Sequence, residues 1–104
     1  MLNISFEFRK GIFFIRLLGD LNNKNYKHKE TLLKNLIIEN NFKYIVINTN
    51  YLNKVDLDGL NYLIKIFDMT KMNDSNLIIC DRNNIFERLL NNSIPNIKEE
   101  IDVL

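Results

Sequence analysis

Carboxylates make up most of the side chains in this sequence that could carry chemistry. Asp56 and Asp58 stand two residues apart directly before Gly59, and Asp20 lies far upstream. Aspartate oxygens bind divalent cations, and an aspartate can also form a covalent phosphoryl intermediate. If the fold gathered these three aspartates at one end of a sheet, they would suit a phosphoacceptor or a metal-dependent enzyme.

Several other features argue against catalysis. Such an aspartate site would place an Asp directly at the end of the third predicted strand, where the chain instead has Asn48 and Asn50. His28 has no nucleophile, cysteine or carboxylate at a spacing typical of a triad or a metal site. The three glycines are isolated from one another, so the sequence holds no glycine-rich phosphate loop. We therefore expect a protein that is not an enzyme and that uses no metal and no cofactor.

The two neighbouring aspartates also have a purely structural interpretation. Asp56 is suited to cap a helix, because its side chain can accept a hydrogen bond from an unpaired amide of the first turn. Asp58 would then lie inside that turn, where the positive end of the helix dipole favours a negative charge. Gly59 removes a side chain at a point where another segment could approach the backbone closely. The residues that follow repeat at helical spacing and predict the buried stripe of this helix: Leu60, Leu63, Ile64 and Phe67.

The hydrophobic pattern of the whole chain predicts an alternation of strands and helices. Apolar and polar residues alternate in the first strand, whereas the later strands are continuous apolar runs of the kind found in buried strands. We expect strands over 2–8, 12–18, 44–48 and 77–80, with a tight turn at Arg9-Lys10-Gly11. Helical spacing predicts a helix over 26–41, a second helix that starts after Asp56 and carries the periodic residues 60–67, and a third after Asp81 in a segment bearing Ile85, Phe86, Leu89 and Leu90. A short final strand is expected within 97–104.

Length, charge and cysteine content narrow the class of protein. A chain of 104 residues has the size of one domain, so we expect a single domain over 1–104. A net charge of +1 gives no long-range field for nucleic acid or for an anionic membrane, and no segment is long and apolar enough to insert across a bilayer. The single cysteine, Cys80, ends an apolar run and has no partner for an internal disulfide. We expect it to be a buried thiol in a cytoplasmic protein.

Two motifs resemble the anti-sigma factor antagonists of bacterial partner-switching systems, which belong to the STAS domain family. Asp56-Leu57-Asp58-Gly59-Leu60 resembles the family motif Asp-Ser-Ser/Thr-Gly-Leu, which opens a helix after a strand. Upstream, Gly19-Asp20-Leu21-Asn22 resembles the Gly-Glu/Asp-Leu-Asp that ends another strand. The resemblance implies an α/β fold with a mixed sheet of four or five strands and helices mainly on one face. Family members usually carry a further C-terminal helix, so we expect a shortened C-terminus here, and self-association as a homodimer through the surface that this uncovers.

The resemblance also implies a mechanism from which this chain departs. In the family, the first Ser of the motif is phosphorylated by a kinase that is itself the anti-sigma factor, and the phosphorylated antagonist releases that kinase. Leu57 occupies this position and has no hydroxyl, so we expect no phosphorylation there. Leu57 is either a hydrophobic contact inside the first helical turn or an exposed apolar side chain on the docking surface, and the sequence leaves both interpretations open. Asp58 carries one permanent charge, which could imitate the phosphorylated state, although a phosphate carries more charge. The sequence therefore leaves open whether binding or release of the partner is constitutive.

From the resemblance we expect a protein-interaction module that binds an anti-sigma factor with a kinase-like ATPase fold. The expected partner-binding residues are those of the two motifs: Asp20, Leu21, Asn22, Asp56, Leu57, Asp58 and Gly59. Asn22 keeps a hydrogen-bonding side chain but lacks the charge of the Asp that the family commonly has there. Two alternatives remain: a regulatory subunit of a lipid-transport ATPase complex that uses the same domain, and the aspartate-based enzyme considered above.

Overall fold

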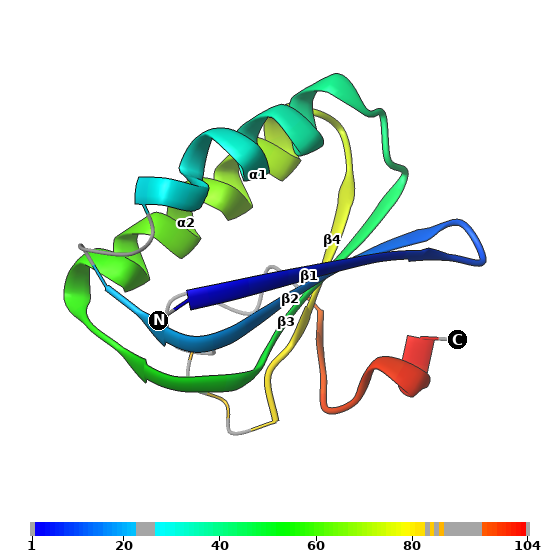
Figure 1. The fold of residues 1–104 in the computed structure, drawn as a ribbon. Coiled ribbons are helices and arrows are strands. Elements are labelled where there is room, and N and C mark those ends of the chain that lie inside the picture. The colour runs from blue at the N-terminus through cyan, green and yellow to red at the C-terminus, as the bar shows by residue number, and fades with distance from the viewer. Residues whose placement is uncertain (1, 23–26, 83, 85, 87–94, 104) are drawn as a thin grey trace.

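The computed structural model describes residues 2–22, 27–82, 84, 86 and 95–103. These residues form one sheet, two α-helices and a short 3₁₀ helix (Figure 1). The elements follow one another as β1 (Leu2–Arg9), β2 (Ile12–Leu21), α1 (Lys27–Glu39), β3 (Tyr44–Val55), α2 (Leu57–Met72), β4 (Asn76–Cys80), β5 (Asn96–Ile97) and the 3₁₀ helix η1 (Glu100–Val103).

The sheet is mixed, and its strands lie in the order β1-β2-β3-β4-β5. β1 and β2 are antiparallel, whereas each later strand is parallel to the one before it. Parallel neighbours cannot be joined by a tight turn, so α1 connects β2 to β3 and α2 connects β3 to β4. Both helices lie on the same face of the sheet (Figure 1). The predicted α/β fold with a mixed sheet is therefore confirmed.

A two-residue turn joins β1 to β2. Arg9 pairs with Ile12, and the residues between them, Lys10 and Gly11, have φ angles of 52° and 83°. Two consecutive positive φ angles are typical of the type I′ turn, whose twist matches that of the flanking strands. The predicted turn at this position is confirmed, and it fixes the register of the whole hairpin.

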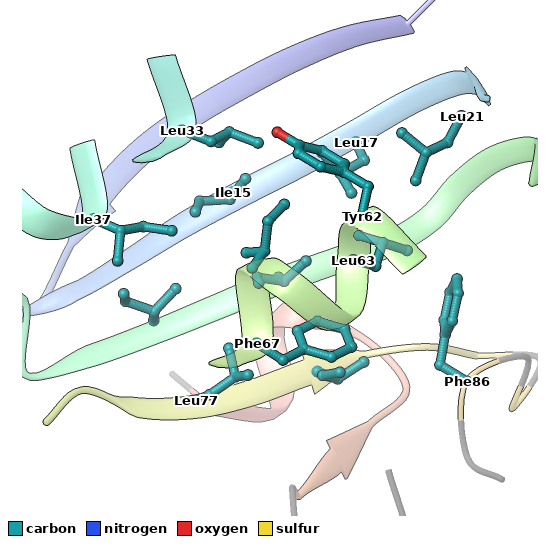
Figure 2. Packing of buried hydrophobic residues seen from close by; sticks show 14 of the residues in the cluster. Ile15, Leu17, Leu21, Leu33, Ile37, Tyr62, Leu63, Phe67, Leu77 and Phe86 are labelled. Atoms are coloured by element: carbon teal, nitrogen blue, oxygen red, sulfur yellow. The ribbon is translucent and has the colours of Figure 1, made fainter. Parts of the chain in front are cut away.

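The main core lies between the two helices and the sheet. Leu33 and Ile37 of α1 and Leu63 of α2 are fully buried against Ile15 and Leu17 of β2. Figure 2 shows these side chains converging from the three elements. Burying a side chain of this size contributes roughly 1.5–3 kcal/mol to the free energy of unfolding, so this layer supplies much of the stability of the domain.

The buried stripe of α2 differs in part from the prediction. Leu63 and Phe67 are buried as expected, but Leu60 and Ile64 are only half-buried. The helix is rotated so that Gly59, Tyr62 and Ile66 are buried in place of Leu60 and Ile64. The buried residues of α2 are Gly59, Tyr62, Leu63, Ile66, Phe67 and Thr70.

A second, smaller apolar cluster lies on the opposite face of the sheet. Phe14, Val46 and Cys80 are buried there, and Ile97 and Val103 from the C-terminal residues pack against them. The central part of β2 is thus covered on both faces, as its continuous apolar run predicts. Cys80 is buried, also as predicted.

Charged side chains hold η1 against this face. Arg16 of β2 makes ion pairs with Glu7 of β1 at 2.8 Å and with Glu100 of η1 at 2.7 Å. Asn48 of β3 also donates a hydrogen bond to Glu100. The prediction of a final strand is correct only for the short β5, because the residues after it form η1 instead.

β3 is longer than its apolar run predicted, since it continues past Asn48 to Val55. In this added part Leu52 and Val55 pack against the main core, whereas Lys54 is exposed. This part is therefore a half-exposed strand, and a search for continuous apolar runs does not find it.

The helix predicted after Asp81 falls mostly outside the described residues. Of its predicted apolar positions, Ile85, Leu89 and Leu90 are outside them, and Phe86 is buried in the main core. The backbone amide of Phe86 donates to Asp81 Oδ2 at 2.8 Å. Among the described residues, no helix is long and apolar enough to cross a membrane.

Candidate functional site

The two sequence motifs meet at one end of the sheet. β2 and β3 run parallel, and their register places Asp20 beside Lys54 and Leu21 beside Val55. The backbone amide of Asp56, the next residue of the chain, donates to the Leu21 carbonyl at 3.1 Å. The end of β2 and the start of α2 therefore form one continuous surface, although 35 positions separate Leu21 from Asp56.

Asp56 caps the N-terminus of α2, as predicted. Its backbone is extended, with φ −88° and ψ 178°, and its side chain accepts a hydrogen bond from the Gly59 amide at 2.8 Å. The Asp56 carbonyl accepts the first helical bond from the Leu60 amide at 2.9 Å. Asp58 lies in the first turn, where its carboxylate faces the positive end of the helix dipole. The first turn is thus fixed by side-chain capping and by its junction with β2.

Gly59 is where α2 touches the end of β2. A Cβ atom built on Gly59 would lie 2.3 Å from the Leu21 carbonyl oxygen and 2.9 Å from Leu21 Cγ. Both distances are shorter than a real Cβ contact, so only glycine allows the helix to pack this closely. The sequence predicted a close approach at this position, and the structure identifies Leu21 as the segment that approaches.

Leu57 is exposed at the tip of the helix start. Its exposed fraction is 72%, and its neighbours Asp56 and Asp58 are exposed as well. Of the two interpretations of Leu57, the hydrophobic contact inside the first turn is therefore wrong, and the exposed apolar side chain is what the structure shows. The surface of the first turn consists of one large apolar side chain between two carboxylates.

Two of the predicted partner-binding residues do not present a side chain to solvent. Leu21 is fully buried and belongs to the main core, so the expectation that its side chain contacts a partner is wrong. Gly59 is buried too, and it shapes the site through the close packing described above. Asp20 and Asn22 are half-buried and flank Leu21. We define the Leu57 surface as the accessible side chains of the two motifs, namely Asp20, Asn22, Asp56, Leu57 and Asp58.

The described part of the chain does not gather the three aspartates into a group of possible metal ligands. Within the part of the chain that the structure describes, which includes Asp20, Asp56 and Asp58, no three His, Cys, Asp or Glu side chains are grouped so that they could hold an ion. This arrangement gives no support to the metal-dependent alternative.

The two hydroxyl groups of Thr49 and Ser75 are poorly placed for modification. Thr49 near the middle of β3 is only 2% exposed, and its hydroxyl donates to the Cys80 carbonyl at 3.1 Å. Ser75 is 9% exposed, and its hydroxyl donates to the Phe42 carbonyl at 2.6 Å. A kinase could reach neither hydroxyl without opening the fold.

Sequence reasoning missed the exposed residues of the second half of β3. Tyr51 is 53% exposed, and Lys54 is exposed next to Asp20 in the register. Both lie on the stretch that leads directly into Asp56. No period-2 alternation marks this stretch, because Leu52 and Val55 are three positions apart and a register shift of β3 against β2 lets both pack on the main core.

Comparison with known families covers the stretch that contains both motifs. A sequence model of the STAS domain matches residues 3–99. The chain belongs to the STAS domain family. Among solved structures, this STAS domain resembles the unphosphorylated form of the anti-sigma factor antagonist SpoIIAA, with a TM-score of 0.77 at 13% identity over 97% of this chain and 93% of that one.

Two further structures have the same fold as this STAS domain. One is an anti-sigma factor antagonist from Mycobacterium paratuberculosis, with a TM-score of 0.79 at 12% identity over 98% of this chain and 90% of that one. The other is the phosphorylated form of the Bacillus cell fate determinant SpoIIAA, with a TM-score of 0.73 at 15% identity over 97% of this chain and 96% of that one. Most of each neighbour is matched, so the likeness extends over the whole fold.

Proposed function

We propose that this STAS domain is an anti-sigma factor antagonist that binds its anti-sigma factor through the Leu57 surface and does not release it by phosphorylation. The observation that carries the proposal is the 72% exposure of Leu57 at the first turn of α2. Family membership and the likeness to the anti-sigma factor antagonist SpoIIAA support the class of protein. The expected partner is an anti-sigma factor with a kinase-like ATPase fold, in the cytoplasm.

The chemistry of the Leu57 surface suggests what the partner must offer. Full burial of a leucine side chain contributes roughly 1.5–3 kcal/mol, which corresponds to a ten- to hundredfold change in affinity. Asp56 and Asp58 beside it would favour a partner pocket that is apolar at its centre and basic at its rim, because charge complementarity raises the association rate and selects the partner. Carboxylates at the rim would stay partly solvated, so their desolvation cost stays small.

The absence of a hydroxyl at Leu57 leads us to propose persistent binding. A phosphate would add about −1.5 to −2 charges and three acceptor oxygens at the centre of the interface, enough to disrupt it by repulsion and desolvation. Leu57 cannot receive this group, and the Thr49 hydroxyl in the middle of β3 is buried and hydrogen-bonded. Asp58 adds a single charge beside the apolar side chain rather than replacing it. The complex would then be controlled by the amounts of the two proteins.

Affinity capture from the native cell extract tests the proposal. The tagged wild type is compared with Leu57→Glu and with the control Met72→Glu, which changes another exposed apolar side chain at the far end of α2, 86% exposed. Bound proteins are identified by mass spectrometry, and the affinity for the recovered anti-sigma factor is measured by calorimetry. We expect the wild type and Met72→Glu to recover the anti-sigma factor, and Leu57→Glu to bind it at least tenfold more weakly.

Three outcomes would contradict this proposal. Recovery of components of a lipid-transport ATPase would favour the alternative of a transporter regulatory subunit. Equal recovery of the anti-sigma factor by the wild type and Leu57→Glu would show that another surface binds it. Incubation of the complex with ATP and Mg²⁺ is expected to leave the chain unmodified, and phosphate mapped to Thr49 would show that a phosphorylation switch persists.

A further inference from the structure

β1 is the edge of the sheet, and its outer side pairs with no other strand among the described residues. It is eight residues long, from Leu2 to Arg9, and it lies in front of the other strands in Figure 1. An edge of this length exposes a row of backbone donors and acceptors that can pair with another strand. Proteins usually protect such edges with proline, bulges or charges that point inward, and the sequence of β1 contains no proline.

The hairpin register determines which backbone groups point outward. In a hairpin with a two-residue loop, the residues next to the loop form a hydrogen-bonded pair, and such pairs alternate along the ladder. Arg9 pairs with Ile12 beside the loop, so the odd-numbered residues of β1 use their backbone groups toward β2. The outward N–H and C=O groups belong to the even-numbered residues: Leu2, Ile4, Phe6 and Phe8.

The same alternation separates the side chains of β1 into an apolar and a polar row. Ile4 and Phe6 pack against the main core yet remain half-buried, and Phe8 is 61% exposed beside Phe42, with ring centroids 5.9 Å apart. The opposite row is polar and consists of Asn3, Ser5, Glu7 and Arg9. The apolar row is left incompletely covered along the free edge.

We infer that β1 pairs antiparallel with β1 of a second copy of this chain, with Phe6 on the two-fold axis. In this register Ile4 lies opposite Phe8 of the second copy, and Ser5 lies opposite Glu7 of the second copy. Apolar side chains then face apolar ones on the helix face of the sheet, and polar side chains face polar ones on the other. Cross-strand pairs of aromatic and β-branched residues of this kind are stabilising.

Charge disfavours the register that is shifted toward the turn. Shifting the two-fold axis by one residue toward the turn would place Glu7 directly opposite Glu7 of the second copy, and like charges in that position are destabilising. With the axis at Phe6, Glu7 faces a serine and Arg9 faces Asn3 of the second copy. This self-complementarity points to a second copy as the occupant of the edge, and the inference does not depend on the function proposed above.

The mass of the protein in solution tests the inference. Strand pairing alone makes a small interface, so we expect the mass from light scattering to rise with concentration from 12.4 kDa toward twice that value. Phe8→Lys should hold the protein at the monomer mass, because it puts a charge into the apolar row without changing a buried residue. The control Met72→Lys removes a more exposed apolar side chain from α2 and should dimerise like the wild type. A wild type that stays monomeric, or a Phe8→Lys variant that dimerises equally, would overturn the inference.

Disulfide trapping tests the register itself. Asn3 and Arg9 of the second copy would form a non-hydrogen-bonded pair, whose Cα atoms lie about 4.5 Å apart, within the range that a disulfide spans. We expect mild oxidation to cross-link a mixture of Asn3→Cys and Arg9→Cys chains far more than either variant alone. The native Cys80 is buried and should not interfere. The register centred on Phe6 would be rejected if either variant cross-linked as well alone as in the mixture, or if the mixture did not cross-link.

Discussion

Replacing Gly59 with alanine should destabilise the domain, even though alanine is the better helix former. In a helix interior the substitution alone would gain about 1 kcal/mol. The new Cβ would lie 2.3 Å from the Leu21 carbonyl oxygen, so α2 and β2 must separate by about 1 Å to reach ordinary van der Waals contact. Overpacking of this kind costs about 1–3 kcal/mol. The separation would also weaken the hydrogen bond from the Asp56 amide to Leu21, worth about 0.5–1.5 kcal/mol.

The balance of these effects is a net loss of about 0.5–3.5 kcal/mol in the free energy of unfolding. Urea denaturation followed by circular dichroism measures it, with Asn61→Ala as the matched control, because Asn61 is an exposed residue two positions further along α2. The control should be neutral or slightly stabilising, since it gains helix propensity and meets no clash. If Gly59→Ala proved as stable as the control, α2 would not pack against Leu21 as closely as described.

Three further predictions concern other parts of the fold. Asp56→Ala should lower the free energy of unfolding by about 0.5–2 kcal/mol, because it removes the helix cap. Asp56→Asn keeps a capping side chain and should lower it by only a few tenths of a kcal/mol. Equal urea midpoints for the two variants would contradict the capping role. Hydrogen bonding to Arg16 lowers the pKa of Glu100 below its ordinary value of 4.5, so the stability it adds is fully present above pH 4.5 and is lost as the pH falls through the lowered pKa. Glu100→Gln should therefore be less stable than the wild type at pH 7, and urea denaturation at pH 7, 4.5 and 3 should show this gap closing toward acid; a constant gap would contradict the ion pair. Burial raises the pKa of the Cys80 thiol to about 11, so a thiol reagent at pH 8 should label it only as the protein unfolds. Rapid labelling of the native protein would show that the C-terminal residues Ile97 and Val103 do not cover Cys80 as described.

The fold was predictable wherever a local pattern decides the structure. The β1–β2 hairpin follows from alternation and a turn sequence, and the buried strands follow from continuous apolar runs. The buried stripe of α2 was harder to predict, because apolar residues occupy a wide arc of this helix. Helical periodicity alone does not tell which of these residues face the core. The contact of Gly59 with Leu21 sets the rotation of α2, and it joins residues far apart in sequence. The docking of η1 depends on the pair between Arg16 and Glu100, which has no local signature.

The candidate site was predictable in its position but not in every residue. Asp56 and Gly59 have the structural roles that their residue types suggested. Leu21 was assigned to the surface because it belongs to a motif, yet motif membership does not tell which side chains face outward. Its distance of four residues from Leu17 on the same strand places both on one face, and Leu17 is buried. The predicted strand ended at residue 18, so its alternation was not extended to Leu21, and the longer β2 of the structure explains the burial.

Some residues of the Asp56 motif are needed for the fold, whereas Leu57 is not. Asp56 and Gly59 are needed to start α2 and to pack it on β2, so a STAS domain that had lost every partner would still keep them. The side chain of Leu57 makes no comparable contribution to the fold, because it is 72% exposed. Folding gains little from an exposed leucine, which adds apolar surface to water. Leu57 departs from the family motif, and the stability of the fold does not explain why a leucine is present there. We propose that it is present because it binds a partner.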